Sequence, residues 1–463
     1  MKTIIFLNIK GGVGKTATAT TVAHMLATRY NKKVLLVDTD AQMNSTMMYS
    51  DVDFVSIFNG ICEGKTTSTN KSVETLLLDR NADIHECIIH TNYENLDIIP
   101  SCLTLSEAEE RIKGDVISPK QTKLKRHLKK VEDEAITELV GRLKEIGYHV
   151  ITDGEFRRAT WHLDFMWGFD GVGHVETKTG LPFHGEAAMI DDTFLVGKIK
   201  SSKEHPFVEH FRFVKQFEDE ETVAKQTIPA PAQFFAQFTM PFNRVETEKY
   251  YSSDDELADD IVKAYASFID DLYKAGCRNL QLDDCTWGML ADKTATLVYG
   301  KKTFEGLKEV QKLYKDINNR VIDQAPEDMI INTHVCRGNF HSTYASSGAY
   351  TPVADVLFGE ENANAYYLEF DDERSGGFEP LAKVSGNKKV VLGLITTKSP
   401  VLEDKAQVIA RIREAEKFAP LDRLYLSPQC GFASCEIGNK LTEDEQWAKL
   451  KLVKEIAEEV WGK

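Results

Sequence analysis

Seven short apolar runs recur from residue 150 onward, and each run ends in polar or chemically reactive residues. The runs span residues 150–152, 227–229, 280–282, 330–332, 366–368, 390–392 and 424–426. Helix-like segments separate them, and this alternation is typical of a parallel α/β fold. Functional side chains at the carboxyl ends of successive strands indicate a (β/α)8 barrel of the TIM type. Because no eighth strand is found after residue 135, we expect the first barrel strand to be missing or substituted.

The composition limits where the protein works and what it binds. A length of 463 residues indicates two or three domains. The net charge of −16 gives no general attraction to nucleic acid or to an anionic membrane, so we expect neither as a partner. We interpret the basic residues between Lys120 and Lys130 as a solvated helix face. No stretch approaches the ~18 apolar residues of a membrane span, and eight scattered cysteines fit a reducing, cytoplasmic location.

Four residues near strand ends have the chemistry of zinc ligands. His334 and Cys336 are two apart on one strand end, so their side chains point the same way. Glu369 and Cys430 follow two other strands of the predicted barrel. One imidazole, two thiolates and one carboxylate suit Zn²⁺ in number and softness, and we predict a zinc site. The remaining cysteines are interpreted as small buried apolar residues: Cys62, Cys87, Cys102, Cys277, Cys285 and Cys435.

Further carboxylates at the strand ends are candidates for substrate binding. A thiol that binds zinc loses its proton and becomes a nucleophile at neutral pH. Asp283 and Glu155 follow neighbouring strands and are placed to hold a substrate ammonium group, and Asp153 is assigned to the same binding region. The alternative is that these carboxylates cap helices or pair with arginines such as Arg157 and Arg158.

The start of the chain contains a phosphate-binding loop. Residues 3–8 are expected to form a buried strand, a glycine-rich sequence follows, and residues 18–30 are expected to form a helix. In such a loop, backbone N–H groups face the phosphates, Lys15 reaches the β- and γ-phosphates, and Thr16 holds Mg²⁺. ATP and Mg²⁺ are therefore predicted ligands. The predicted nucleotide-binding residues of the loop are Lys10, Gly11, Gly12, Gly14, Lys15 and Thr16.

Two more acidic residues follow the second predicted strand, residues 33–37. Carboxylates at the carboxyl end of such a strand lie beside the phosphate-binding loop. Asp40 is placed to orient water and Asp38 to support the metal shell. The alternative is that one of them caps the following turn.

Residues 1–131 resemble the first part of the ParA/MinD-type partition ATPases, through KGGVGKT and LLVDTDAQ. The resemblance implies ATP-driven homodimerisation, in which Lys10 reaches the nucleotide of the other subunit. That family continues with an apolar strand ending in Asp-x-x-Pro. Here the next apolar strand leads instead to Asp153-Gly-Glu155, which belongs to a different pattern. ATP hydrolysis is expected to be impaired; the alternative is that Asp153 replaces the missing carboxylate.

Residues 132–463 resemble a second family. The runs DGEFRR, LQLDD, THVC, YLEF and LSPQCG are similar to the catalytic domain of cobalamin-independent methionine synthase, in particular to its short single-barrel relatives. The resemblance implies transfer of a methyl group from 5-methyltetrahydropteroyltriglutamate to the sulfur of homocysteine. It implies zinc bound by His334, Cys336, Glu369 and Cys430, and contacts to the amino acid from Glu155 and Asp283.

Two features differ from that second family. The full-length enzymes have a proton-donating histidine where this chain has Lys398. Lys398 is predicted to be catalytic together with Asp283; the alternative is that Lys398 binds an anionic part of the methyl donor. The first barrel strand of the family is absent. We predict that residues 96–101 fill its place and pair with residues 149–153.

The chain is thus predicted to have two parts, a partial P-loop segment at residues 1–131 and a zinc-dependent methyltransferase barrel at residues 132–463. The barrel is expected to act on homocysteine or a related thiol, with methyl-folate or another compound as methyl donor. One alternative is an ATP-binding partition or interaction protein with a passenger barrel. Another is an inactive fusion.

Overall fold

The computed structural model describes residues 15–39, 44–49, 72–78, 82–101, 120–175, 181–183, 187–188, 192–435 and 437–462. The chain divides into two compact units, one within residues 2–135 and the other within residues 136–463. Helix α6 (Lys120–Ile146) contains the boundary. None of the described helices has both the length and the apolar character that crossing a membrane requires.

The first unit is a small parallel α/β segment. Its sheet has the order β1-β3-β2, in which β1 and β3 are parallel and β2 and β3 antiparallel. The side chains of Ala23, Ala27 and Tyr49 pack with Leu96 and Ile98 to form its core. The elements are α1 (Lys15–Thr28), β1 (Val34–Val37), α2 (Asn44–Tyr49), α4 (Val73–Leu78), η1 (His85–Cys87), β2 (Ile89–His90) and β3 (Leu96–Ile99).

Strand β3 does not fill the gap in the barrel, and that prediction is wrong. Val34 is the register partner of Leu96, and Val37 is the partner of Ile99, so β3 pairs with β1. The physical reason is local burial, because Leu96 and Ile98 are fully buried within the first unit. The predicted strand at residues 3–8 lies outside the described residues.

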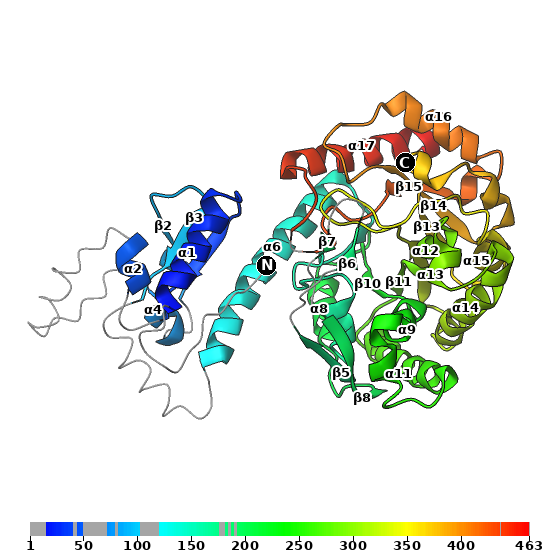
Figure 1. Ribbon diagram of the computed structural model, residues 1–463. Helices are drawn as coiled ribbons and strands as arrows, with labels where there is room; N and C mark the ends of the chain where they lie inside the picture. The colour runs from blue at the N-terminus through cyan, green and yellow to red at the C-terminus, as the bar shows by residue number, and fades with distance from the viewer. Residues whose placement is uncertain are drawn as a thin grey trace, which may run out of the picture. The chain divides into compact units, whose positions relative to one another are not determined.

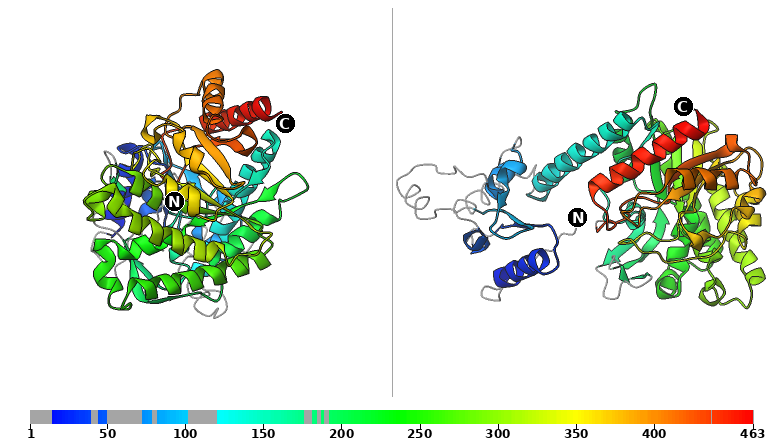
Figure 2. Two further views of the ribbon diagram at one scale, coloured as in Figure 1. Left: turned by 90° about the vertical axis from the view of Figure 1, so that its right-hand side faces the viewer. Right: turned by 90° about the horizontal axis from the view of Figure 1, so that it is seen from above.

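The second unit contains the predicted barrel strands. Strands β10 to β15 form one parallel sheet in chain order, and β4 pairs in parallel with β9. These strands lie inside a layer of helices that includes α9, α11, α14 and α15 (Figures 1 and 2). Each of the seven predicted runs contains a strand. These seven strands are β4 (Val150–Ile151), β10 (Gln226–Pro229), β11 (Asn279–Asp284), β12 (Ile330–Val335), β13 (Ala365–Glu369), β14 (Lys389–Ile395) and β15 (Leu424–Pro428). The short strand β9 (Val223–Ala224) lies outside the predicted runs.

Within the described residues, the strand layer of the barrel is one position short of eight, in agreement with the prediction. Strands β9 and β10 follow each other along the chain, and together they link β4 to the six-stranded sheet. Among the described residues, no strand joins β15 to β4. A short antiparallel bridge between Thr160 and Cys435 connects the loops that follow these two strands. The backbone N–H of Trp161 also donates to the carbonyl of Ser434 at 3.1 Å.

Helices α6 and α17 (Glu443–Trp461) meet on the outside of this gap. The Arg142 guanidinium donates to Glu443 at 2.9 Å and lies 4.0 Å from the centre of the Trp447 ring. The Tyr148 hydroxyl donates to the carbonyl of Leu450. The helix layer is therefore continuous where the strand layer is not.

Side-chain caps mark the starts of α11 (Asp254–Lys274) and α17. Ser253 caps α11 by accepting from the N–H of Glu256, and Gly276 follows the helix with φ +96°. Thr442 and Glu445 form a capping box at the start of α17. The other α-helices are α7 (Leu163–Met166), α8 (Pro206–Lys215), α9 (Pro231–Thr239), α10 (Pro241–Thr247), α11 (Asp254–Lys274), α12 (Thr286–Ala291), α13 (Ala295–Val298), α14 (Lys308–Ile322), α15 (Ala354–Glu360) and α16 (Lys405–Ala415). Four short 3₁₀ helices also occur, η2 (Phe304–Leu307), η3 (Glu373–Ser375), η4 (Glu379–Lys383) and η5 (Leu421–Arg423).

Two small antiparallel pairs interrupt the barrel between β4 and β9. Strand β5 (Asp170–Val175) pairs with β8 (Asp192–Lys200), and β6 (Leu181–Pro182) pairs with β7 (Ala187–Ala188). These two strand pairs were not predicted from the sequence.

Candidate metal site

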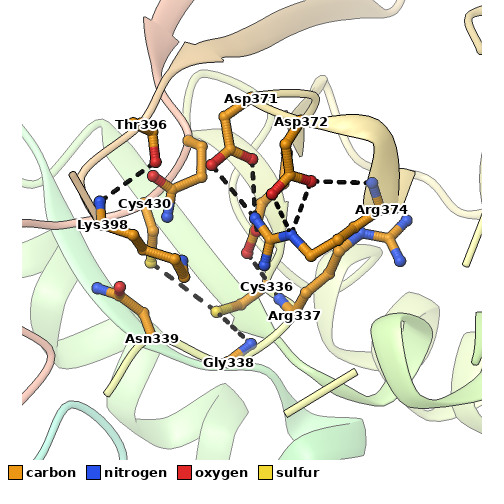
Figure 3. Close-up of polar contacts among 12 residues, drawn as sticks. Cys336, Arg337, Gly338, Asn339, Asp371, Asp372, Arg374, Thr396, Lys398 and Cys430 are labelled. Atoms are coloured by element: carbon orange, nitrogen blue, oxygen red, sulfur yellow. Dashed lines mark hydrogen bonds and ion pairs between the residues drawn. The ribbon is translucent and has the colours of Figure 1, made fainter. Parts of the chain in front are cut away.

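Three of the four predicted metal ligands converge at the carboxyl end of the barrel sheet. His334 lies near the end of β12, Cys336 follows that strand, and Cys430 follows β15. One ligand atom from each lies within 4.8 Å of the other two. The two sulfur atoms of Cys336 and Cys430 are 3.8 Å apart (Figure 3). Such a group of one imidazole and two thiols has the composition of a metal site.

The imidazole of His334 has one ring nitrogen paired and one available. Its Nδ1 lies 3.1 Å from the carbonyl of Tyr367, and its buried Nε2 has no hydrogen-bond partner. A backbone carbonyl on Nδ1 fixes the tautomer that leaves Nε2 as an electron-pair donor. Burial lowers the pKa of His334, but the neighbouring Cys430 thiol outweighs it and raises the pKa to about 9.

The Cys430 thiol is correspondingly acidic. The neighbouring Cys336 thiol and His334 imidazole lower the pKa of Cys430 well below its usual range, against the effect of burial. The positive charges of His334 and Lys398 act in the same direction. The site therefore favours a thiolate, which is the form that binds metal ions.

Glu369, the fourth predicted ligand, ends β13 beside this group but is not one of its three converging members. Its side chain is fully buried, and Oε1 accepts a hydrogen bond from the backbone N–H of Arg337 at 2.7 Å. Its Oε2 has no hydrogen-bond partner and lies 3.7 Å from the Arg374 guanidinium. Burial is the main cause of its raised pKa, and Lys398 opposes this effect.

Arg374 is held in place by the loop after β13. Its guanidinium donates to Asp371 and Asp372, at 3.0 Å and 2.7 Å (Figure 3). Its side chain is only 7% exposed. Because these two carboxylates neutralise Arg374, the carboxylate of Glu369 remains available for another cation.

The predicted substrate-binding residues surround the same strand ends. Asp283 is the register partner of His334 on β11 and is buried. Burial raises the pKa of Asp283, and the charge of His334 opposes the rise. Glu155 accepts from the Arg158 guanidinium at 2.9 Å and from the Thr227 hydroxyl at 2.8 Å. Glu155 thus has an arginine partner, and its role in substrate binding stays a prediction.

Asp153 and Lys398 are the remaining predicted substrate-binding and catalytic residues. Asp153 Oδ1 accepts from the N–H of Glu155 at 2.9 Å, and its buried Oδ2 has no partner. Lys398 follows β14, and its buried Nζ has no hydrogen-bond partner. Figure 3 shows Lys398 on the Cys430 side of the site, while Arg374 lies on the opposite side.

In the first unit, Asp38 has a structural contact. Its buried carboxylate accepts from the N–H and the hydroxyl of Thr46, at 2.8 Å and 2.7 Å. The Thr46 hydroxyl also accepts from the N–H of Ser101. Asp38 therefore ties β1 to α2, which agrees with the alternative of a capping role.

The remaining nucleotide-loop residues are less fully described. Lys15 opens α1, and the carbonyl of Thr16 accepts from the Thr20 hydroxyl at 2.8 Å. The predicted residues Lys10, Gly11, Gly12, Gly14 and Asp40 lie outside the described residues.

Sequence reasoning missed two residues of the site. Cys285 was interpreted as a buried apolar residue, but it is partly exposed, and it follows the end of β11 as Cys336 follows the end of β12. The spacing of Asp283 and Cys285 repeats that of His334 and Cys336, which was an available signal. Arg337 is 1% exposed, and its guanidinium has no hydrogen-bond partner but lies 4.4 Å from the Tyr350 ring centre. No feature of the sequence pattern marked it.

Comparison with known proteins agrees with this division of the chain. Residues 107–459 match the family described as cobalamin-independent synthase, catalytic domain, and residues 1–135 match the family described as AAA domain. The uncharacterized protein YxjG of Bacillus subtilis is 40% identical over 340 residues, covering 72% of this chain and 86% of YxjG.

A solved structure from Listeria monocytogenes, of a candidate vitamin-B12-independent methionine synthase, is 35% identical with a TM-score of 0.56. The match covers 77% of this chain and 94% of the Listeria chain. The sporulation initiation inhibitor protein Soj of B. subtilis is 35% identical over 131 residues, which are 28% of this chain and 45% of Soj. The Soj match thus covers 28% of this chain, whereas the YxjG and Listeria matches cover 72% and 77%. The chain therefore belongs to the family of cobalamin-independent synthases, through the catalytic domain that forms its barrel.

Proposed function

We propose that the barrel, residues 132–463, is a zinc-dependent methyltransferase that methylates the thiol of homocysteine to form methionine. The convergence of His334, Cys336 and Cys430 within 4.8 Å is the observation that supports this function most directly. His334 Nε2 and Glu369 Oε2 are buried without hydrogen-bond partners. Burying such polar atoms costs free energy unless they bind a cation. The donors suit Zn²⁺ in number and softness.

Each proposed residue has a separate role in the reaction. When bound, zinc supplies a Lewis acid that lowers the pKa of the substrate thiol. Asp283 and Glu155 hold the ammonium group of the amino acid, and Asp153 supports the backbone turn that carries Glu155. As the new carbon–sulfur bond forms and the bond between methyl group and donor breaks, Lys398 supplies a proton to the departing donor.

A metal assay tests the proposal. Purified protein is expected to contain one zinc ion per chain, and Cys336→Ala is expected to lose most of it. Cys435→Ala, which changes a partly exposed thiol outside the ligand group, is the matched control and should retain the metal. If Cys336→Ala keeps its zinc, the ligand assignment is wrong.

An activity assay follows the same variants. Homocysteine and methyltetrahydropteroyltriglutamate are expected to give methionine with the unmodified protein and with Cys435→Ala, but not with Cys336→Ala. Replacing the polyglutamyl donor with monoglutamyl methyl-folate or another methyl compound identifies the donor. Absence of methionine formation with every donor from zinc-loaded protein would refute the proposed reaction while leaving the metal site intact.

For the P-loop segment we propose nucleotide binding without efficient hydrolysis. Asp38 accepts two hydrogen bonds from Thr46, which supports a structural role for this carboxylate. Binding of a fluorescent ATP analogue in the presence of Mg²⁺, with no release of phosphate above that of Lys15→Ala, is the expected result.

A further inference from the structure

A chain of polar contacts lies on the face of β11 that carries Asp283. Leu280 and Leu282 of this strand belong to the hydrophobic core. Because side chains alternate along a strand, Gln281 and Asp283 share the opposite face, which is the interior of the barrel. The Gln281 side-chain amide donates to Asp283 Oδ1 at 2.7 Å. Asp283 therefore has a fixed hydrogen-bond partner from its own strand.

Lys225 supplies the other end of this chain of contacts. It lies between β9 and β10, where the backbone changes from pairing with β4 to pairing with β11. Its backbone N–H donates to the carbonyl of Ile151 at 2.9 Å. Its Nζ donates to Gln281 Oε1 at 2.9 Å and lies 4.3 Å from the centre of the Tyr367 ring. Since β12 separates β11 from β13, a side chain that contacts both strands crosses the barrel interior.

These contacts fix the orientation of the Gln281 amide. An ammonium group only donates hydrogen bonds, and an ionised carboxylate only accepts them. The amide oxygen must therefore face Lys225, and the amide NH₂ group must face Asp283. Within the part of the chain that the structure describes, the Lys225 ammonium contacts this amide and a ring but no carboxylate. Its positive charge strengthens the hydrogen bond that Gln281 donates, because successive hydrogen bonds polarise one another.

The second carboxylate oxygen of Asp283 is open to a ligand. Oδ1 accepts from Gln281, whereas Oδ2 accepts from no group among the residues that the structure describes. Asp283 is buried and is the register partner of His334. A ligand held at the proposed metal site thus has beside it a carboxylate oxygen whose direction is fixed. Such an oxygen suits a charge-assisted hydrogen bond from an ammonium group.

We propose that Lys225 and Gln281 are positioning residues that orient Asp283 toward the ammonium group of the substrate. They make the site select an amino-bearing thiol over a thiol that lacks the amino group. Both residues act through Asp283. The inference rests on the proposed function, which assigns the substrate ammonium group to this carboxylate.

Binding of two thiols to the full-length, zinc-loaded protein tests this selectivity. Homocysteine and γ-mercaptobutyrate share the thiol and the carboxylate, but only homocysteine carries the ammonium group. A charge-assisted hydrogen bond corresponds to roughly tenfold or more in affinity, so Gln281→Leu should weaken homocysteine binding by about that factor. Its affinity for γ-mercaptobutyrate should not change. Calorimetric titration measures both, and an equal loss for the two thiols would overturn the proposal.

A double-variant cycle tests whether Lys225 acts through Gln281. Lys225→Met removes the ammonium group but keeps an unbranched side chain, and it should weaken homocysteine binding selectively. In a protein that already carries Gln281→Leu, it should have little further effect. Lys225→Arg can still donate to the amide and should restore most of the affinity. Exposed Lys417→Met is the matched control and should bind both thiols like the unmodified protein. Additive effects of the two substitutions would contradict a shared path to Asp283.

Zinc content and methionine formation separate this inference from the proposed function. The variants should keep the zinc of the unmodified protein, because none of the substituted side chains is a proposed ligand. If Gln281→Leu loses zinc, Gln281→Glu takes its place, since it can accept from Lys225 but offers ionised Asp283 no donor; it should show the same selective loss. If the unmodified protein prefers homocysteine but forms no methionine, the proposed reaction fails and this inference stands. If it binds homocysteine no more tightly than γ-mercaptobutyrate, the inference is overturned, whether or not methionine forms.

Discussion

The protonation state of Glu155 is expected to affect binding of the substrate ammonium group. Glu155 is a non-glycine residue with φ +61°, a conformation that is retained mainly where structure or function requires it. Burial raises the pKa of Glu155 to about 7, although the charge of Arg158 opposes the rise. Its carboxylate therefore gains a proton when the pH falls below about 7.

This pKa predicts a pH-dependent KM for homocysteine. Protonated Glu155 no longer attracts an ammonium group, so KM should rise as the pH is lowered from 8 to 6. Glu155→Gln is expected to have a high KM with little dependence on pH over the same range. Steady-state kinetics at constant ionic strength measure both. An unchanged KM profile in Glu155→Gln would exclude this carboxylate as the ammonium partner.

Lys398 can be separated into its two predicted roles by substitution. General acid catalysis contributes roughly 10²–10⁴-fold to a rate, so Lys398→Met should lower kcat by about 100-fold or more if Lys398 donates a proton. Lys398→Arg keeps the charge but does not release a proton near neutral pH, and it should be equally impaired. Rescue of the donor KM by arginine, with kcat nearly intact, would instead assign Lys398 to binding an anionic donor. Zinc content, measured in parallel, shows whether the site itself is preserved.

At the scale of elements, a buried polar network connects the strands to the helix layer. Glu361 accepts from Thr333 on β12, from Trp287 on α12 and from Asn318 on α14. Asn318 also donates to Asp284 on β11 at 3.0 Å. Burial, with a smaller effect of Asp284, raises the pKa of Glu361 to about 7.

The raised pKa predicts how stability depends on pH. In the folded protein Glu361 binds its proton more tightly than in the unfolded chain, so its contribution is complete below pH 4.5 and is lost as the pH rises through 7. The shift corresponds to roughly 3 kcal/mol. Glu361→Gln, whose amide can satisfy the same partners, should therefore gain stability relative to the unmodified protein between pH 5 and 8. Urea unfolding of the second unit measures the difference, with exposed Glu327→Gln as control; a pH-independent difference would contradict the assignment.

The barrel strands were predictable from the sequence. The arrangement at the missing strand position between β15 and β4 was not. Apolar runs such as 390–392 identify buried parallel strands because both faces of such strands are covered. The apolar character of residues 96–99 does not specify which sheet they join, because an apolar strand can pair with any sheet that has a free edge. The prediction that they pair with the barrel was therefore wrong. The placement of Asp283 beside His334 depends on the register between β11 and β12, which the local pattern of either strand does not specify.

At the scale of the whole molecule, the described residues of the two units form separate cores. Ala23, Ala27, Tyr49, Leu96 and Ile98 form the core of the first unit. The core of the second unit extends from Ile136 to Ile456. Because the first unit lies within residues 2–135 and the second within residues 136–463, the shorter unit buries a smaller fraction of its surface, and we expect it to unfold at a lower temperature than the barrel.

Metal removal should distinguish the two units in one calorimetric experiment. A ligand that binds only the folded state stabilises it by about 4 kcal/mol when present at ~1,000 times its dissociation constant. Since His334, Cys336 and Cys430 all lie in the second unit, chelation should lower the barrel transition by several degrees and leave the first transition in place. Adding ATP and Mg²⁺ should move only the first transition. A single transition that responds to both ligands would show instead that the units unfold together, with α6 as the continuous element that contains their boundary.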